Sequence, residues 1–365
     1  MTRAWLLAPT TQGTGAAAAP FAVRAIDSPA PSPGPGEIVL AIEAATIGPV
    51  DLAVASARRG DVDGDDALVA GGSAVGRVIA AGESGHALMG RRAVFGPHVP
   101  CGECDVCRRG GAVVCPTGAR LGVTVRGALA ERVTMPIRWV LGFGGELDVP
   151  GSAAAALGGD AALAYAMYAR AGVGPRDATV VLGDGPVARL LVEILIAKNA
   201  TPVVVVRSNA PQGWLAWVSA RAHVATVTDD APDAESRAAA LAAAQAAGHG
   251  ARPWKLFETS GEAARQTRAL AIAGPRATVV LAAPGATGMP SAPVDLGDAL
   301  DHDSTVIAVA GAHPDLLVDV AAMAVKRELD VAGATETVTV DELGAALARR
   351  AGVRWTTGLV VTVPS

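Results

Sequence analysis

The sequence predicts an α/β protein of two domains, one rich in β-strands and one built on a doubly wound parallel sheet. Residues 1–150 hold many short strand candidates separated by turn residues. From about residue 152, apolar runs of strand length alternate with helical stretches, which is typical of a parallel sheet covered by helices. The length of 365 residues agrees with two domains of ordinary size.

In the first part, a turn-forming run rich in proline and glycine at 29–36 precedes the clearest strand, Glu37 to Ile47. Further strands are expected at 76–80, 92–95 and 129–135. An alanine-rich helix is expected at 152–171, because Gly172 follows it as a common helix stop.

The second part is expected to form strands joined by helices at 187–198 and 231–248; the strands are 179–182, 202–206, 255–258, 277–282 and 305–310. After Gly311, a helix at 314–327 and a strand at 358–363 are expected to return to the first domain. We therefore expect one domain over 1–155 and 312–365, and a second over 156–311.

The composition argues against nucleic acid or a membrane as the main partner. The chain has 30 Lys+Arg against 35 Asp+Glu and no basic block. Its hydrophobic content of 51% is mostly alanine and valine in short pieces, and Asp160 interrupts the most apolar stretch. The apolar start of the chain is too short for a signal peptide. We expect a cytoplasmic protein.

All four cysteines fall in one short window with the spacing Cys-x2-Cys-x2-Cys-x7-Cys; they are Cys101, Cys104, Cys107 and Cys115. Four thiolates that converge in this way are typical of a closed, structural zinc site. Unligated thiols, a disulfide knot and an iron–sulfur cluster are the alternatives. Disulfides are disfavoured in a chain without an export signal.

A glycine-rich turn joins the first strand of the second part to a helix. Gly183 and Gly185 begin the pattern Gly-x-Gly-x-x-Ala, and Pro186 and Val187 open the helix. In this setting the first glycine permits a tight turn, the second lets the backbone approach a pyrophosphate, and the helix N-terminus faces the phosphates. The pattern predicts a dinucleotide site; the alternative is a merely tight turn.

The next strand should decide which dinucleotide binds. An acid at its end would accept hydrogen bonds from the ribose of NAD. Instead, Arg207 and Ser208 follow the strand. A guanidinium there would pair with the 2′-phosphate of NADP(H), which we favour over an ordinary solvated arginine.

Taken together, these features resemble the medium-chain dehydrogenase/reductase superfamily, in its zinc alcohol dehydrogenase branch. The resemblance rests on Pro-Gly-Glu-Ile at 35–38, the cysteine loop, Gly-Ala-Leu-Ala-Glu at 127–131, the Gly183 motif and Phe-Glu-Thr-Ser-Gly at 257–261. It implies a GroES-like catalytic domain with a structural zinc loop, a Rossmann domain, and a homodimer or homotetramer. His313 replaces an arginine that relatives often place near the pyrophosphate, so it could contact the coenzyme. The start of the chain is most similar to members that act on acyl-CoA thioesters.

The sequence departs from this family at the catalytic zinc. The branch normally supplies ligands from Cys-Gly-x-Asp, from Gly-His-Glu, and from a Cys or acid before the coenzyme domain. This chain has Gly-Pro-Val-Asp at 48–51, Gly-Gly-Ser at 71–73, and Gly159. A catalytic zinc needs three protein ligands and an open position. We therefore expect one structural Zn²⁺ per chain and no catalytic Zn²⁺.

Without a metal electrophile, reduction of a conjugated C=C bond is favoured over carbonyl reduction. We expect NADPH-dependent reduction of a short-chain 2-enoyl-CoA, for which 3,3-dimethylacrylyl-CoA is one candidate. The alternatives are a zinc-free alcohol or ketone dehydrogenase, a quinone-type reductase, and a non-catalytic NADP-binding sensor or partner subunit. The candidate proton donors are Asp51, His98 and Asp160. Each has a structural alternative, respectively a hydrogen-bond acceptor, a surface loop histidine and a helix-surface acid, and water is a further possible donor.

Overall fold

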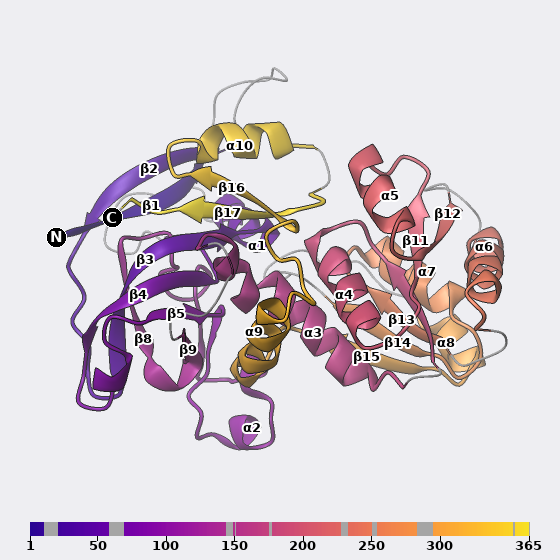
Figure 1. Ribbon diagram of the computed structural model, residues 1–365, viewed down its shortest axis with the longest axis horizontal. Helices are drawn as coiled ribbons and strands as arrows, with labels where there is room; N and C mark the ends of the chain where they lie inside the picture. The colour runs from indigo at the N-terminus through magenta and orange to yellow at the C-terminus, as the bar shows by residue number, and fades with distance from the viewer. Residues whose placement is uncertain are drawn as a thin grey trace. The chain divides into compact units, whose positions relative to one another are not determined.

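The computed structural model describes residues 1–10, 21–57, 69–143, 149, 151–174, 177–227, 233–249, 254–282, 295–352 and 355–364. The chain divides into two compact units, which are shown in Figure 1. Unit 1 comprises Met1–Ala162 and Ala312–Ser365, and unit 2 comprises Leu163–Gly311. The sequence placed the first boundary at 155/156, whereas the division falls within helix α3 (Asp160–Ala171).

Unit 1 is built on a mostly antiparallel sheet whose strands come from both ends of the chain, so its colours in Figure 1 run from indigo to yellow. Its order is β16 (Thr335–Thr339), β17 (Gly358–Thr362), β3 (Glu37–Ile47), β4 (Ala74–Ala81), β5 (Arg92–Phe95) and β9 (Val140–Phe143), with β8 (Arg132–Pro136) also paired to β3. Strands β1 (Thr2–Pro9) and β2 (Phe21–Ser28) form a separate antiparallel pair. The expected return of the C-terminal strand is confirmed, because Leu359 of β17 pairs with Ile47 of β3.

Short elements surround this sheet in unit 1. The cysteine loop contains β6 (His98–Val99), α2 (Asp105–Arg108), the 3₁₀ turn η2 (Ala112–Val114) and β7 (Ala119–Arg120). The remaining elements are α1 (Pro49–Ala57), η1 (His86–Leu88), η3 (Ile137–Trp139), η4 (Ala153–Gly158), η5 (Pro314–Leu316), α9 (Leu317–Val325) and α10 (Leu343–Arg350).

The prediction of a single helix at 152–171 is wrong in one respect, because the helical segment is interrupted at Gly159. Its first part is η4 and its second part is α3. The physical reason is close backbone packing. A Cβ on Gly158 would lie 2.2 Å from the carbonyl oxygen of Phe95 in β5, so only glycine permits the approach. The interruption places Asp160 at the first turn of α3.

Unit 2 is a six-stranded parallel sheet, and the expected alternation of strands and helices is confirmed. Its order is β12 (His223–Val227), β11 (Val203–Arg207), β10 (Ala178–Leu182), β13 (Trp254–Glu258), β14 (Thr278–Ala282) and β15 (Thr305–Val309). This is the strand order of the doubly wound dinucleotide-binding fold, with the first strand at the centre. The helices are α4 (Pro186–Ala197), α5 (Gln212–Ser219), α6 (Asp233–Ala246), α7 (Ala263–Ile272) and α8 (Gly297–Asp301).

The sheet of unit 2 is held by apolar side chains on both faces. Every residue of β10 and β11 is buried, and most of these residues are valine. Continuous apolar strands of this kind are typical of a parallel sheet covered on both sides. In the part of the chain that the structure describes, no helix is long and apolar enough to cross a bilayer.

Candidate functional site

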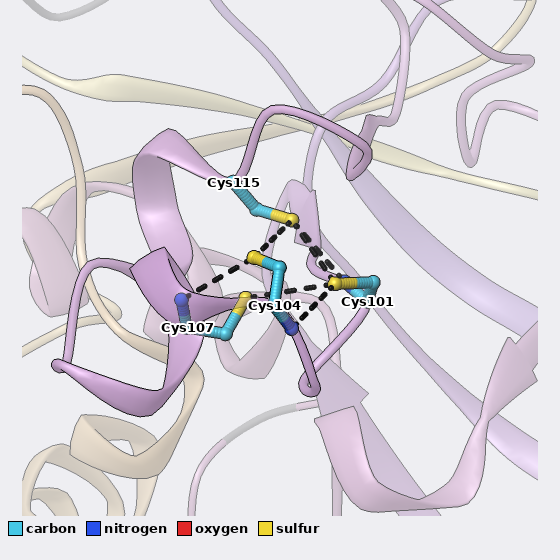
Figure 2. A group of neighbouring side chains, drawn as sticks. All are labelled: Cys101, Cys104, Cys107 and Cys115. Atoms are coloured by element: carbon cyan, nitrogen blue, oxygen red, sulfur yellow. Dashed lines mark hydrogen bonds between the residues drawn. The ribbon is translucent and has the colours of Figure 1, made fainter.

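The four cysteines predicted to bind metal come together at one point of unit 1 (Figure 2). Their sulfur atoms all lie within 4.8 Å of one another, and measured pairs are separated by 3.5, 3.8 and 3.9 Å. Four sulfurs placed about 2.3 Å from a zinc ion at tetrahedral corners would be about 3.8 Å apart. A disulfide needs about 2.05 Å, so the arrangement fits a Zn²⁺ ion rather than a disulfide knot.

The loop also offers backbone N–H groups to the sulfur atoms. The N–H groups of Cys104, Cys107 and Cys101 donate to sulfur at 3.4 Å, and one of these bonds caps helix α2. Hydrogen bonds from the Thr117 hydroxyl and from backbone groups lower the pKa of Cys101 to about 5, whereas burial raises the pKa of Cys107 to about 12. Donors of this kind stabilise the thiolate form that binds a metal.

The cysteine loop is tied to η3, whose Trp139 ring also contacts His313, a residue singled out in the sequence. The indole Nε1 of Trp139 donates to the carbonyl oxygen of Pro100 at 2.8 Å, and Arg138 donates to the carbonyl of Cys101. The Trp139 ring meets the ring of His313 edge-on, with centroids 6.2 Å apart. His313 caps η5 by accepting a hydrogen bond from the Asp315 N–H. Its predicted contact with a coenzyme stays a prediction.

Two of the positions where the family resemblance places zinc ligands lie beside a hydrogen-bond network of hydroxyl groups. The Ser73 hydroxyl lies 2.7 Å from the Thr46 hydroxyl and donates to the Ala155 carbonyl at 3.0 Å. A Cβ on Gly159 would lie only 2.8 Å from the Ser73 oxygen, and one on Gly72 would lie 3.3 Å from a proline side chain. Among the described residues, the cysteine cluster is the one group of three or more His, Cys, Asp or Glu that brings ligand atoms together.

Asp51 lies at the start of α1, and both of its carboxylate oxygens are engaged. One oxygen accepts from the Gly48 N–H at 2.8 Å and the other from the Gly71 N–H at 2.6 Å. Burial raises the pKa of Asp51, and these bonds oppose that rise. The bonds fasten the β3–α1 turn to the segment before β4, which is a structural role. Its predicted catalytic role stays a prediction.

His98 is placed opposite Arg120 in the short β6–β7 pair. Burial, and then the positive charge of Arg120, lower the pKa of His98 to about 4, so its imidazole is neutral at physiological pH. The charge of Arg120 also opposes the rise that burial causes in the pKa of Asp51. The sequence analysis missed Arg120, and its only signal was its place between the last cysteine and the Gly-Ala-Leu-Ala-Glu segment.

Asp160 is partly buried, and it has no hydrogen-bond or ion-pair partner within the described ranges. Burial raises its pKa from 3.8 to about 6. Its Oδ2 lies 2.8 Å from the point that a Cβ on Gly358 would occupy, next to the sheet of unit 1. Asp160 is therefore an acid that exchanges its proton near neutral pH.

The predicted dinucleotide turn lies at the end of β10 in unit 2. Gly183 has a φ of +146°, and a Cβ there would lie 2.0 Å from Oγ1 of Thr259, which donates to the Leu182 carbonyl. Glycine is therefore required by the close approach of Thr259, which directly follows the neighbouring strand β13. Helix α4 starts at Pro186 with Gly185 as its N-cap, and glycine has no side chain that could cap it. Pro186 has no N–H, so a phosphate at this end would accept from the N–H groups of the residues that follow Pro186 in the first turn.

Arg207 lies at the end of β11, as predicted, but it already has an anionic partner. Its Nη2 donates to Oδ2 of Asp184 at 2.6 Å, and Oδ1 of Asp184 lies 3.6 Å from Nη1 of Arg265. Ser208 is exposed, and its backbone N–H donates to the Val227 carbonyl. The sequence analysis missed Asp184 and Arg265. The position of an acid between Gly183 and Gly185 was the available signal.

Comparison with known proteins identifies part of the chain by sequence and all of it by fold. Residues 34–144 match the alcohol dehydrogenase GroES-like domain. The chain is 36% identical over 114 residues to L-threonine 3-dehydrogenase of Stenotrophomonas maltophilia, and 34% identical over 113 residues to that of Xanthomonas campestris. Each alignment covers 30% of this chain and 32% of the relative, so the match spans about a third of these enzymes.

Solved structures match over the full length at low identity. Galactitol-1-phosphate dehydrogenase from Escherichia coli has a TM-score of 0.80 at 16% identity, with all of both chains covered. A zinc-binding dehydrogenase from Sinorhizobium meliloti bound to NADP has a TM-score of 0.76 at 18% identity, again over both complete chains. Residues 34–144 thus match an alcohol dehydrogenase GroES-like domain, and the whole chain has the fold of these solved dehydrogenases.

Proposed function

We propose that the chain is an oxidoreductase that binds NADPH in unit 2 and reduces the C=C bond of a 2-enoyl thioester. The GroES-like domain and the doubly wound sheet support an oxidoreductase, because the similar enzymes are named as dehydrogenases. The NADP reported in one similar structure supports the coenzyme class. The arrangement around Ser73 is the observation that favours C=C reduction.

The described residues of unit 2 fit a dinucleotide. Gly183 gives the tight turn, the first turn of α4 would present N–H groups to a pyrophosphate, and Arg207 lies at the strand end where a ribose phosphate would bind. When bound, the reduced nicotinamide would supply a hydride. Unit 2 binds and orients the coenzyme.

The argument for C=C reduction starts from Ser73 and Gly159. A carbonyl reductase of the zinc type uses the metal as a Lewis acid on the oxygen. The chain has glycine at 48, 72 and 159, and the Ser73 hydroxyl occupies the space beside Gly159 through its bonds to Thr46 and Ala155. These residues offer no ligand set there. A C=C bond conjugated to a thioester does not need one, because its β-carbon is already electrophilic.

Asp160 is the residue that we assign to protonation. Hydride adds to the β-carbon, the electron pair of the C=C bond moves to the thioester as an enolate, and the α-carbon takes a proton. A carboxyl group with a pKa of about 6 and no described partner holds that proton near neutral pH and recovers it from water. Asp51 is less suited because both of its oxygens accept backbone bonds.

The cysteine cluster is proposed to hold one structural Zn²⁺ and to take no part in the reaction, since four thiolates leave no open position. Its bonds to Trp139 and Arg138 tie the metal loop to the rest of unit 1. We further propose that the chain forms homodimers or homotetramers and acts on a small acyl-CoA.

The test combines metal analysis with a coenzyme oxidation screen on the purified chain. We expect about one zinc per chain, and oxidation of NADPH with crotonyl-CoA or a branched enoyl-CoA. Asp160→Asn should lower kcat at least tenfold, whereas Asp319→Asn, on the exposed face of α9, is the matched control and should not. Two zincs per chain, or zinc-dependent oxidation of L-threonine or a polyol without enoyl-CoA turnover, would refute the proposal. Coenzyme binding without any turnover would favour the sensor alternative.

A further inference from the structure

The turn at the end of β10 contains a carboxylate at an unusual place. Asp184 stands between the two glycines of the turn, where a bound pyrophosphate would bring further negative charge. Asp184 as a residue is 7% exposed, and its carboxylate meets the guanidinium of Arg207, a residue that is 5% exposed. The Nη2 to Oδ2 distance is 2.6 Å, typical of a strong charge-assisted hydrogen bond.

A second guanidinium lies on the other side of the same carboxylate. Nη1 of Arg265, from α7, is 3.6 Å from Oδ1 of Asp184, and its Nε is 3.8 Å from the carboxylate of Glu262. The two arginines therefore face two carboxylates. Asp184 thus lies between two guanidinium groups before any ligand arrives.

The ion pair with Asp184 affects how Arg207 can bind the coenzyme in the proposed function. A 2′-phosphate must either displace Asp184 from Arg207 or share the guanidinium with it. Both alternatives reduce the affinity that the 2′-phosphate adds, because a carboxylate and a phosphate close to each other repel in a site with little water. A coenzyme ribose with a free 2′-hydroxyl carries no such charge.

We propose that Asp184 is a specificity-determining residue that competes with the 2′-phosphate for Arg207. The paired state thereby limits the preference for NADPH over NADH that Arg207 alone would give. This inference rests on the proposed coenzyme site in unit 2, and it is independent of the substrate that the enzyme reduces.

The experiment measures the dissociation constants of 2′,5′-ADP and 5′-AMP by calorimetry, because the two probes differ only in the 2′-phosphate. In the wild-type chain, 2′,5′-ADP should bind less than about tenfold more tightly than 5′-AMP. Asp184→Asn keeps the size and shape of the side chain while removing its charge. It should tighten 2′,5′-ADP about tenfold and leave 5′-AMP within about twofold.

A double-mutant cycle separates competition from a structural effect. In Arg207→Gln the added Asp184→Asn change should give no further gain for 2′,5′-ADP, because the two residues act through one contact. Asp303→Asn is the matched control: it removes a charge from an exposed carboxylate of unit 2, and should change neither affinity.

Three results would overturn the inference. One is an unchanged ratio of the two affinities in Asp184→Asn, and another is an equal gain for both probes. The third is a wild-type chain that binds 2′,5′-ADP more than about a hundredfold more tightly than 5′-AMP. This measurement tests the inference even when the variant does not fold. If neither probe binds the wild-type chain, the proposed coenzyme site fails, and this inference fails with it. Binding of both probes with an unchanged ratio overturns the role of Asp184 alone.

Discussion

Asp160→Asn is expected to stabilise the protein at neutral pH even though it should impair catalysis. The wild-type carboxyl group is partly buried and unpartnered in the described structure, and burial raises its pKa from 3.8 to about 6. Ionising it therefore costs free energy in the folded state that is not paid in the unfolded chain. Asparagine has the same shape and no charge to bury.

The magnitude follows from the size of the pKa shift. A shift of about two units is worth about 3 kcal/mol, at about 1.4 kcal/mol per unit. Because the pKa of Asp160 is higher in the folded than in the unfolded chain, its ionisation destabilises the folded wild type as the pH rises from about 4 to about 6. Above about pH 6 this loss of stability no longer grows. The gain from Asp160→Asn should thus reach about 3 kcal/mol at pH 8, fall to about 1.5 kcal/mol at pH 5, and vanish near pH 3.

Urea unfolding of the wild type and the variant at pH 5, 6.5 and 8 measures this difference directly. Each pair is compared at the same pH, so the titration of the cysteines and other groups cancels. Asp319→Asn is again the control, since removing its exposed carboxylate should give no gain at any of the three pH values. A gain that is the same at pH 5 and pH 8, or a loss that grows with pH, would refute the assignment of an ionised, unpartnered Asp160.

Three further substitutions test other parts of the structure. Gly183→Ala should abolish coenzyme binding and destabilise unit 2 by about 2 kcal/mol or more, since its Cβ would lie 2.0 Å from Thr259 Oγ1; thermal unfolding and nucleotide titration check both. Cys104→Ala should reduce zinc from about one to near zero per chain by metal analysis, and lower the unfolding temperature. Ser73→Ala should cost about 1–2 kcal/mol in urea unfolding because the Ala155 carbonyl loses its buried donor; an unchanged midpoint would contradict that.

Features encoded by neighbouring residues could be predicted from the sequence. The spacing of the cysteines placed four sulfurs in one short loop, and their convergence follows from local turns such as the cap of α2. The turn at Gly183 was predictable for the same reason, because strand, glycine pair and helix are consecutive. The parallel sheet of unit 2 was also predictable, because strands and helices alternate along the chain.

Contacts between distant segments could not be predicted in this way. The ion pair of Asp184 with Arg207 needs the register of two adjacent strands and the direction of two side chains. The interruption at Gly159 depends on β5 packing against the glycine before it. A helical pattern of alanines carries no information about such a neighbour, so the sequence predicted one continuous helix.

The place of β17 in the sheet of unit 1 has a consequence for synthesis on the ribosome. This strand lies between β3 and β16, yet it is made after the whole of unit 2. All of unit 2 leaves the ribosome before it, so unit 2 can complete its own sheet first. Until then β3 has an unpaired edge, which is a site for misassembly or chaperone binding. Removal of residues 356–365, which include β17, should therefore leave unit 2 folded and make unit 1 prone to aggregation.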